Sequence, residues 1–151
     1  MTKAKNLSVA VIAASLGRPG NLAFLLRTLA RQTHLPDQVI LSLESERDAP
    51  PLQDLPFETV VTYGPRGTCA QRNRGLNLLK PGTDIVVFYD DDFVPSKHSL
   101  AGLSAFFAAN PAVNGATGIV VADGINGPGL SAAQAMQIVE AEEAKGAPAI
   151  G

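Results

Sequence analysis

The sequence predicts an α/β domain whose mostly parallel sheet is flanked by helices. Short apolar runs rich in β-branched residues alternate along the chain with segments whose leucines and phenylalanines recur at helical spacing. The run at residues 85–89 shows no polar alternation, which is typical of a parallel strand covered on both faces. The 151 residues are 46% hydrophobic, enough for one domain, residues 1–151, with a sizeable core. Strands and helices in alternation form parallel sheets with right-handed crossovers.

The first half of the chain is expected to supply three strands and two helices. Residues 9–13 form the first strand, and the turn after it carries Pro19 where a helix can open. Leucines at i, i+3, i+4 and i+7 give that helix one apolar face: Leu22, Leu25, Leu26 and Leu29. The elements expected next are a strand at 38–43, a surface loop at 44–56, a strand at 57–63, a turn at 64–68 and a helix at 69–79.

The helix expected at residues 69–79 carries polar residues whose roles depend on the face they occupy. Thr68 has the side chain of an N-cap residue. Asn73 shares a helix face with Cys69 and Leu76, so we expect Asn73 to hydrogen-bond the backbone of a buried loop. On the same face, Cys69 is expected to be a small buried hydrophobe.

The second half is expected to continue the alternation after the strand at residues 85–89. Ser96 or Ser99 caps a helix with an apolar face formed by Leu100, Leu103, Phe106 and Phe107. The elements expected after it are a fifth strand at 115–122, a glycine-rich loop at 123–129 and a helix at 131–145. The last helix is expected to turn two residues inward and three outward: Met136 and Val139, and Glu140, Glu142 and Glu143, respectively.

Three consecutive aspartates, Asp90, Asp91 and Asp92, follow the apolar run at residues 85–89. Ligand sites of open α/β sheets lie beyond the carboxyl ends of such strands. Neighbouring carboxylates repel one another, so the cluster indicates Mg²⁺ or Mn²⁺ bound through oxygens together with a phosphate-bearing ligand. The alternative is a solvated acidic turn, and the position after a buried strand favours the cation site.

Composition excludes several other classes of function. The net charge of -2 gives no reason to expect nucleic acid or an anionic membrane surface as a partner. The single cysteine, Cys69, excludes an intrachain disulfide and a cysteine-based zinc site, and His34 and His98 are expected to be surface or capping residues. No stretch approaches the roughly 20 apolar residues of a membrane span, and residues 1–7 lack the core of a signal peptide. We expect a cytoplasmic protein, with the inner face of the membrane as its alternative place of work.

Four segments together resemble family 2 glycosyltransferases, which have the GT-A fold, a Rossmann-like nucleotide-diphospho-sugar transferase architecture. In chain order they are SLGRP at 15–19, LARQT at 29–33 leading into QVI at 38–40, QRNRGL at 71–76 and FYDDDFVP at 88–95. Residues 115–118 add a weaker fifth match. Their order and spacing are far more specific than the Asp-x-Asp element alone. The chain resembles the N-terminal half of such an enzyme, with its sheet truncated after about the fifth strand.

The resemblance implies metal-dependent transfer of a sugar from a nucleotide-diphospho-sugar to a hydroxyl acceptor, as in polysaccharide biosynthesis. Transfer would be inverting in a complete enzyme, and the acceptor would be a glycan, lipid or small molecule. Mn²⁺ or Mg²⁺ would stabilise charge on the departing diphosphate. Carried over residue by residue, Asp90 contacts the ribose or sugar, Asp91 belongs to the donor site, and Asp92 is the metal ligand.

Five further residues are candidates for donor binding. The resemblance places Ser15 and Arg18 in the turn that holds the nucleoside, and Arg72 matches the family's Arg-Asn pair. Glu44 is expected to substitute, displaced by one position, for the aspartate that reads the nucleobase in the family. Arg66 lies in a glycine-flanked turn before a helix N-terminus, where it either binds phosphate or base oxygens or is an ordinary solvated arginine.

Inverting transfer also needs a general base, which deprotonates the acceptor. In the family this base is a carboxylate well downstream of the Asp-x-Asp element, so we expect it outside this chain and assign no catalytic residue. Glu142 and Glu143 are not expected to serve, because they lie on a solvated helix face. The main alternative is therefore a non-catalytic nucleotide-sugar-binding fragment.

Two other classes were weighed against the resemblance. A phosphotransfer domain usually has acids after its first strand, and here that strand ends without one, at Ala13-Ala14-Ser15. A nucleotidyltransferase of related architecture stays open, although the phosphate loop rich in glycine and lysine that it should carry there is missing. A truncated sheet also predicts self-association through its exposed edge.

Overall fold

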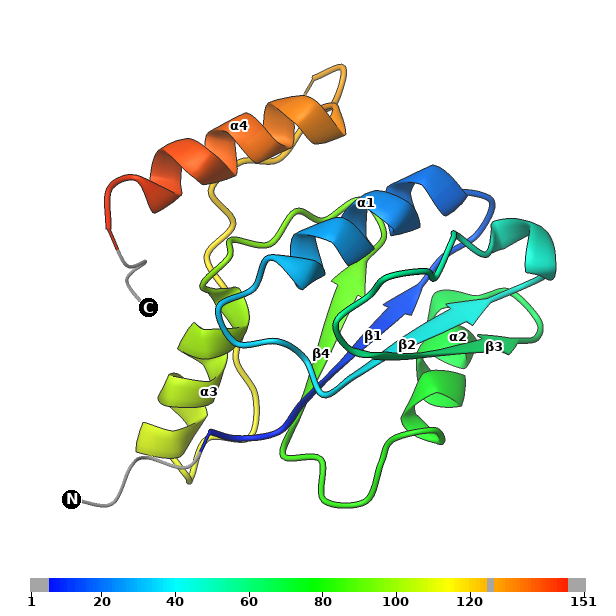
Figure 1. The fold of residues 1–151 in the computed structure, drawn as a ribbon, viewed down its shortest axis with the longest axis horizontal. Coiled ribbons are helices and arrows are strands. Elements are labelled where there is room, and N and C mark those ends of the chain that lie inside the picture. The colour runs from blue at the N-terminus through cyan, green and yellow to red at the C-terminus, as the bar shows by residue number, and fades with distance from the viewer. Residues whose placement is uncertain (1–5, 125–126, 147–151) are drawn as a thin grey trace.

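A computed structural model of the chain describes residues 6–124 and 127–146. Its four strands are all parallel and lie in the order β3-β2-β1-β4 (Figure 1), which confirms the α/β class and the parallel sheet flanked by helices. The elements in chain order are β1 (Val9–Ala14), α1 (Pro19–Ala30), β2 (Gln38–Leu43), the short 3₁₀ helix η1 (Glu46–Asp48), β3 (Glu58–Tyr63), α2 (Thr68–Leu76), β4 (Ile85–Asp90), α3 (Ser99–Ala109) and α4 (Ala132–Glu143).

The core lies between the sheet and α1. Alternate side chains of β1 point toward α1 and pack with its four leucines, all of them buried as predicted from their spacing. The intervening side chain of Ile12 points to the opposite face, where α2 crosses the sheet. A Cβ at Gly75 of α2 would lie 2.7 Å from Ile12 Cγ2, so the glycine lets this helix approach the strand closely.

The strand order creates a switch point beside β1. The chain builds β2 and β3 outward on one side of β1 and then returns to place β4 on the other side. Ala14 at the end of β1 pairs with Ser42 of β2 and with Asp90 of β4, so the carboxyl ends of β1 and β4 are level. The crevice outside such a reversal point is where ligands of open α/β sheets bind.

Two strand predictions are wrong in part. β4 is not covered on both faces: it is a terminal strand of the described sheet, and Phe88 on its α2 side is 40% exposed. Residues 113–124 form no strand, and Ile119 in the middle of the predicted fifth strand is 65% exposed. A β-branched run fits a strand only where a neighbouring strand accepts its hydrogen bonds, and no such pairing forms there among the described residues.

Helix α4 packs through Glu143, which the sequence led us to expect in solvent. The Glu143 side chain is only 6% exposed, its Oε2 lies 2.9 Å from Arg31 Nη2, and its Oε1 accepts the Lys97 backbone N–H at 2.8 Å. Burial acts to raise the pKa of Glu143, but these two partners outweigh it and lower the pKa below 4.5. Glu142, also predicted outward, pairs with Lys145 at the surface.

Within the described residues, no helix is long and apolar enough to cross a membrane.

Candidate active site

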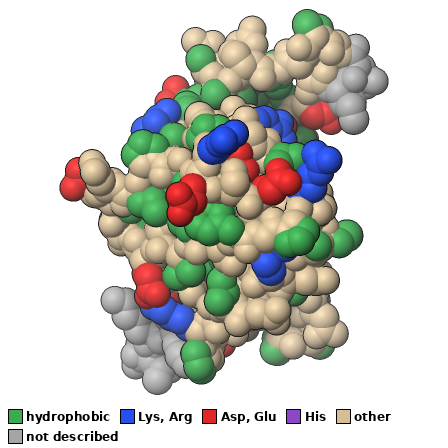
Figure 2. All heavy atoms as spheres, turned by 90° about the vertical axis from the view of Figure 1, so that its right-hand side faces the viewer, with side chains coloured by type: hydrophobic (Ala, Val, Ile, Leu, Met, Phe, Trp, Pro, Cys, Tyr) green, Lys and Arg blue, Asp and Glu red, His purple; other side chains and the backbone are tan. Residues whose placement is uncertain are grey.

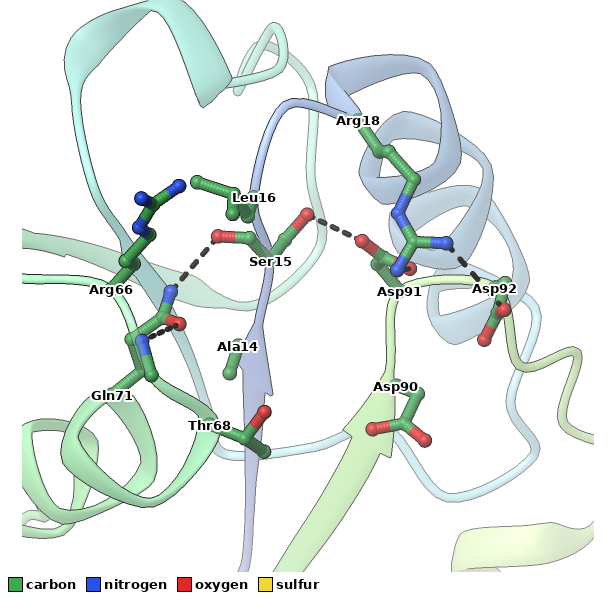
Figure 3. Close-up of a pocket in the computed structure, with 11 residues that line it drawn as sticks. Ala14, Ser15, Leu16, Arg18, Arg66, Thr68, Gln71, Asp90, Asp91 and Asp92 are labelled. Carbon is green, nitrogen blue, oxygen red and sulfur yellow. Dashed lines mark hydrogen bonds and ion pairs between the residues drawn. The ribbon is translucent and has the colours of Figure 1, made fainter.

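A cavity of about 380 Å³ opens at the carboxyl ends of β1 and β4 (Figure 3). The start of α2 and the turn before it form its third side. Its lining residues are Ala14, Ser15, Leu16, Arg18, Arg66, Gly67, Thr68, Gln71, Asp90, Asp91 and Asp92. The structure therefore brings five predicted binding residues and the predicted metal ligand together at the switch point of the sheet.

The three aspartates have different environments. The Asp91 side chain is 1% exposed, whereas those of Asp90 and Asp92 are 69% and 62% exposed. Asp91 Oδ2 accepts the Ser15 hydroxyl at 2.5 Å, and Asp91 Oδ1 lies 2.9 Å from Arg18 Nη2. A buried carboxylate requires such partners because leaving it unpaired would be costly. Asp91 therefore fixes the end of β4 to the turn after β1.

The two outer aspartates present their oxygens to solvent at the mouth of the cavity. Asp92 Oδ2 lies 3.7 Å from Arg18 Nη1, and Asp90 Oδ1 lies 3.2 Å from Arg72 Nη2. Arg72 does not line the cavity, although the sequence made it a donor-binding candidate. Its guanidinium instead lies 5.3 Å from the centre of the exposed Phe88 ring.

Gln71 holds the start of α2 against the sheet, a role that the sequence analysis gave to Asn73. Its buried side-chain amide donates to the Ser15 carbonyl at 2.9 Å and the Ser42 carbonyl at 2.8 Å, and accepts the Gly67 N–H at 3.2 Å. Asn73 is exposed, so the prediction for it is wrong. The signal for Gln71 was its spacing of four from Gly75, the other residue of α2 that faces the sheet.

The turn before α2 supplies the third side of the cavity. Gly67 is the N-cap residue with φ of 131°, a conformation that favours glycine, and Thr68 is the first helical residue rather than the predicted N-cap. Arg66 is exposed and lines the cavity beside this helix N-terminus. Cys69 is exposed, which contradicts its predicted burial, because α2 turns its Gln71 face and not its Cys69 face toward the sheet.

Asp48, and not the predicted Glu44, is the acid after β2 that contacts the turn after β1. Glu44 is exposed and is not among the residues that line the cavity. Asp48, in η1 after β2, is buried, and its Oδ1 accepts the Gly17 N–H at 2.9 Å. Asp48 also closes a capping box with Ser45, and this Ser-x-x-Asp spacing was the available signal. The acid after the second strand thus shapes the β1 turn.

Tyr89 directly precedes the acidic triplet in the chain and stacks on an aromatic ring that follows it. Its ring stacks on Phe93 with ring centres 4.9 Å apart, and the two residues bracket the aspartates in sequence. Burial raises the pKa of Tyr89 to about 12, against a smaller lowering by its hydrogen bond with Ser99. The phenol therefore stays neutral and adds no negative charge next to the carboxylates.

The two exposed carboxylates at the cavity mouth are of the chemical type that binds a hard divalent cation. Among the described residues no group of three or more His, Cys, Asp or Glu side chains is arranged to hold a metal ion. Mg²⁺ commonly needs fewer protein ligands, because it keeps waters and binds through one or two carboxylates plus substrate phosphates. Asp90 and Asp92 offer such exposed carboxylate oxygens, and Arg18 and Arg66 line the same cavity.

Charges on one face of the molecule are mixed in sign. Figure 2 shows basic and acidic side chains lying side by side across the upper half of that face, with hydrophobic side chains between them. No continuous basic stripe of the kind that binds nucleic acid is present on it.

Comparison with known proteins finds no family model and no curated protein that matches this chain.

Proposed function

We propose that this chain binds a nucleotide-diphospho-sugar in the cavity between β1 and β4, as the donor-binding part of a metal-dependent glycosyltransferase with the GT-A fold. The observation that carries the proposal is the convergence of three aspartates, two arginines and a helix N-terminus at the switch point of a parallel sheet. This combination supplies oxygen ligands for a cation and cationic donors for a phosphate at the same place.

The charges in the cavity suit a ligand that is itself mixed in charge. A cation alone would be attracted to Asp90 and Asp92 but repelled by Arg18 and Arg66, and a diphosphate alone would experience the reverse. A diphosphate with a divalent cation presents both signs together. Its cation would be held by Asp92 and Asp90 and would stabilise the charge that develops on a departing diphosphate.

The turn after β1 is proposed to hold the nucleoside end of the donor. Ser15 and Arg18 are fixed there by Asp91, while Leu16 offers an apolar side chain that is 42% exposed at the cavity wall. An exposed apolar residue next to fixed polar groups is typical of small-molecule sites.

Because nucleotide sugars are made in the cytoplasm, we place the protein there, free or at the inner face of the membrane.

The second candidate function is nucleotide-sugar binding without catalysis. Among the described residues, the acids that line the cavity are the three aspartates alone, and our proposal already uses them for the cation and for structure. A carboxylate positioned to deprotonate an acceptor hydroxyl would have to be additional to them. Donor hydrolysis or transfer by the chain would decide for the enzyme over the binding module.

The experiment that tests the proposal is calorimetric titration of UDP, GDP, dTDP and ADP, with and without Mn²⁺. We expect one of them to bind selectively and only with the cation, and Asp92→Asn to weaken that binding at least tenfold while leaving thermal unfolding unchanged. Glu140→Gln removes an exposed carboxylate on α4 as the matched control and should bind like the parent. No binding of any nucleotide by the folded parent, or parent-like binding by Asp92→Asn, would overturn the proposal.

A further inference from the structure

The two outer aspartates of the triplet are each in contact with an arginine, one at the N-terminus of α1 and one in α2. Arg18 precedes the first residue of α1, and Arg72 lies in the second turn of α2. Their guanidinium groups approach Asp92 at 3.7 Å and Asp90 at 3.2 Å, respectively. These are the same two carboxylates that are exposed enough to accept a cation.

The contacts of Arg18 are unequal in strength. Its Nη2 lies 2.9 Å from Oδ1 of Asp91, a buried carboxylate that the Ser15 hydroxyl also fixes; this contact is a close ion pair and not an aligned hydrogen bond. Its Nη1 lies 3.7 Å from the exposed Asp92, beyond ordinary hydrogen-bond distance. One side of the guanidinium is therefore anchored and the other is only loosely engaged. Asp91 acts as a positioning residue for Arg18.

The contact of Arg72 is also exchangeable. The Arg72 and Asp90 side chains are 38% and 69% exposed, and a solvent-exposed ion pair contributes little free energy. Stacking on Phe88, with 5.3 Å between Arg72 Cζ and the ring centre, keeps the guanidinium near the cavity without requiring the carboxylate. Arg72 can therefore leave Asp90 and still remain at the mouth of the site.

We propose that Arg18 and Arg72 are exchangeable counter-ions: they lie against Asp92 and Asp90 in the free protein and transfer to the diphosphate when a cation takes the carboxylates. This inference rests on the proposed function and adds to it a coupling between the two ligands. Arg18 keeps its contact with Asp91 throughout and turns only its Nη1 side. The exchange replaces each Asp–Arg pair by one Asp–cation and one Arg–phosphate pair, and a divalent cation together with the two charges of a sugar-linked diphosphate leaves the net charge of the site unchanged.

The exchange predicts positive coupling between cation and nucleotide. A cation that binds alone displaces the arginines and leaves them unpaired beside it, and a diphosphate that binds alone leaves both carboxylates unpaired. The second ligand to arrive meets groups that the first has already freed. Coupling of this kind is commonly about 5- to 150-fold and has the same value whichever ligand is added first.

The test measures Mn²⁺ affinity with and without the nucleoside diphosphate that the panel of UDP, GDP, dTDP and ADP shows to bind. In the parent we expect the nucleotide to raise Mn²⁺ affinity about tenfold or more beyond what formation of the complex in free solution explains. In Arg72→Met, Mn²⁺ alone should bind about two- to fivefold more tightly, because no ion pair must break, and the coupling factor should fall about threefold or more.

Arg27→Met is a matched control. Arg27 on α1 is exposed and, like Arg72, stacks on an aromatic ring, with its Cζ 5.4 Å from the centre of Phe24, but unlike Arg72 it forms no ion pair with Asp90, Asp91 or Asp92. The Arg27→Met variant removes the same charge and the same kind of stacking as Arg72→Met. Its coupling factor between Mn²⁺ and the nucleotide should equal that of the parent. Should Arg72→Met fail to fold, Arg72→Gln replaces it, with the same expected fall in coupling.

The outcomes separate the exchange from the proposed function. Coupling that is present in the parent and unchanged in the arginine variant would overturn the exchange while leaving nucleotide binding established, because a static charge shifts both affinities without changing their coupling. Equal loss of coupling in Arg27→Met would overturn it too. Absence of nucleotide binding in the parent would reject the proposed function itself.

Discussion

Replacing Gln71 with leucine tests how the site is held together. Leucine keeps nearly the same volume, so the substitution removes hydrogen bonds without opening a cavity. The Ser15 carbonyl, on a buried residue, loses its Gln71 donor, which costs about 1–3 kcal/mol. The Ser42 carbonyl keeps the Ser15 N–H at 3.2 Å and Gly67 is exposed to water, so these two losses together add only about 1 kcal/mol.

We therefore expect Gln71→Leu to lower the free energy of unfolding by about 2–4 kcal/mol. Urea unfolding followed by circular dichroism should show this as a midpoint lower by about 1–2 M with an unchanged slope. Asn73→Ala, an exposed substitution on the same helix, should stay within about 0.5 kcal/mol of the parent. The reasoning is refuted if Gln71→Leu unfolds like the parent, or if the Asn73 variant loses as much stability.

Three further predictions concern local contacts. Ser15→Ala removes the hydroxyl group that donates to the buried Asp91 carboxylate, and it should lower the free energy of unfolding in urea by about 1.5–3 kcal/mol. A loss smaller than about 0.5 kcal/mol would show that this hydrogen bond does not stabilise the turn after β1. Gly75→Ala should lower the free energy of unfolding by about 1–3 kcal/mol, because the fully buried Ile12 cannot move away from the new methyl group. Gly20→Ala, where the new methyl group meets open space, should be neutral or stabilising. Equal melting temperatures for the two variants would contradict the close approach of α2 to β1. Because the folded-state pKa of Glu143 is lowered, its stabilisation of α4 is fully present above pH 4.5 and is lost as pH falls through the lower folded-state value. Protection of the α4 amides, measured relative to the intrinsic exchange rate at each pH, should therefore decrease over that range in the parent. A similar decrease in Glu143→Gln would contradict the assignment.

Local patterns in the sequence predict those elements whose burial depends on one neighbour. The strand at Gln38–Leu43 is buried at every position, its polar residues Gln38 and Ser42 included, and its predicted bounds are confirmed. The apolar stripe of α1 is confirmed because a leucine pattern fixes both the helix and the face that it buries. The acidic triplet was correctly placed at a strand end, and the register of β1 with β4 brings it to the predicted Ser15 and Arg18.

Sequence reasoning fails where two faces compete or where a partner decides. On α2, leucine and cysteine suggested one face, but the small Gly75 allows the opposite face to approach β1, so Gln71 and not Asn73 bonds the loop backbone. Glu143 looked solvated because its partners, the Arg31 side chain and the Lys97 N–H, lie far away in the sequence. Residue spacing cannot show which distant groups will neutralise a buried charge.

The most direct test of the donor site is NMR of the ¹⁵N-labelled chain with Mn²⁺ and the selected nucleoside diphosphate. Paramagnetic Mn²⁺ broadens the amide signals nearest to it, so the measurement locates the cation residue by residue. We predict broadening centred on Asp90–Asp92, extending to Ser15 and to the Gly67–Thr68 turn, and sparing α4. Broadening centred on the acids of α4, or none beyond that caused by free Mn²⁺, would contradict a cation–diphosphate site at the β1–β4 switch point.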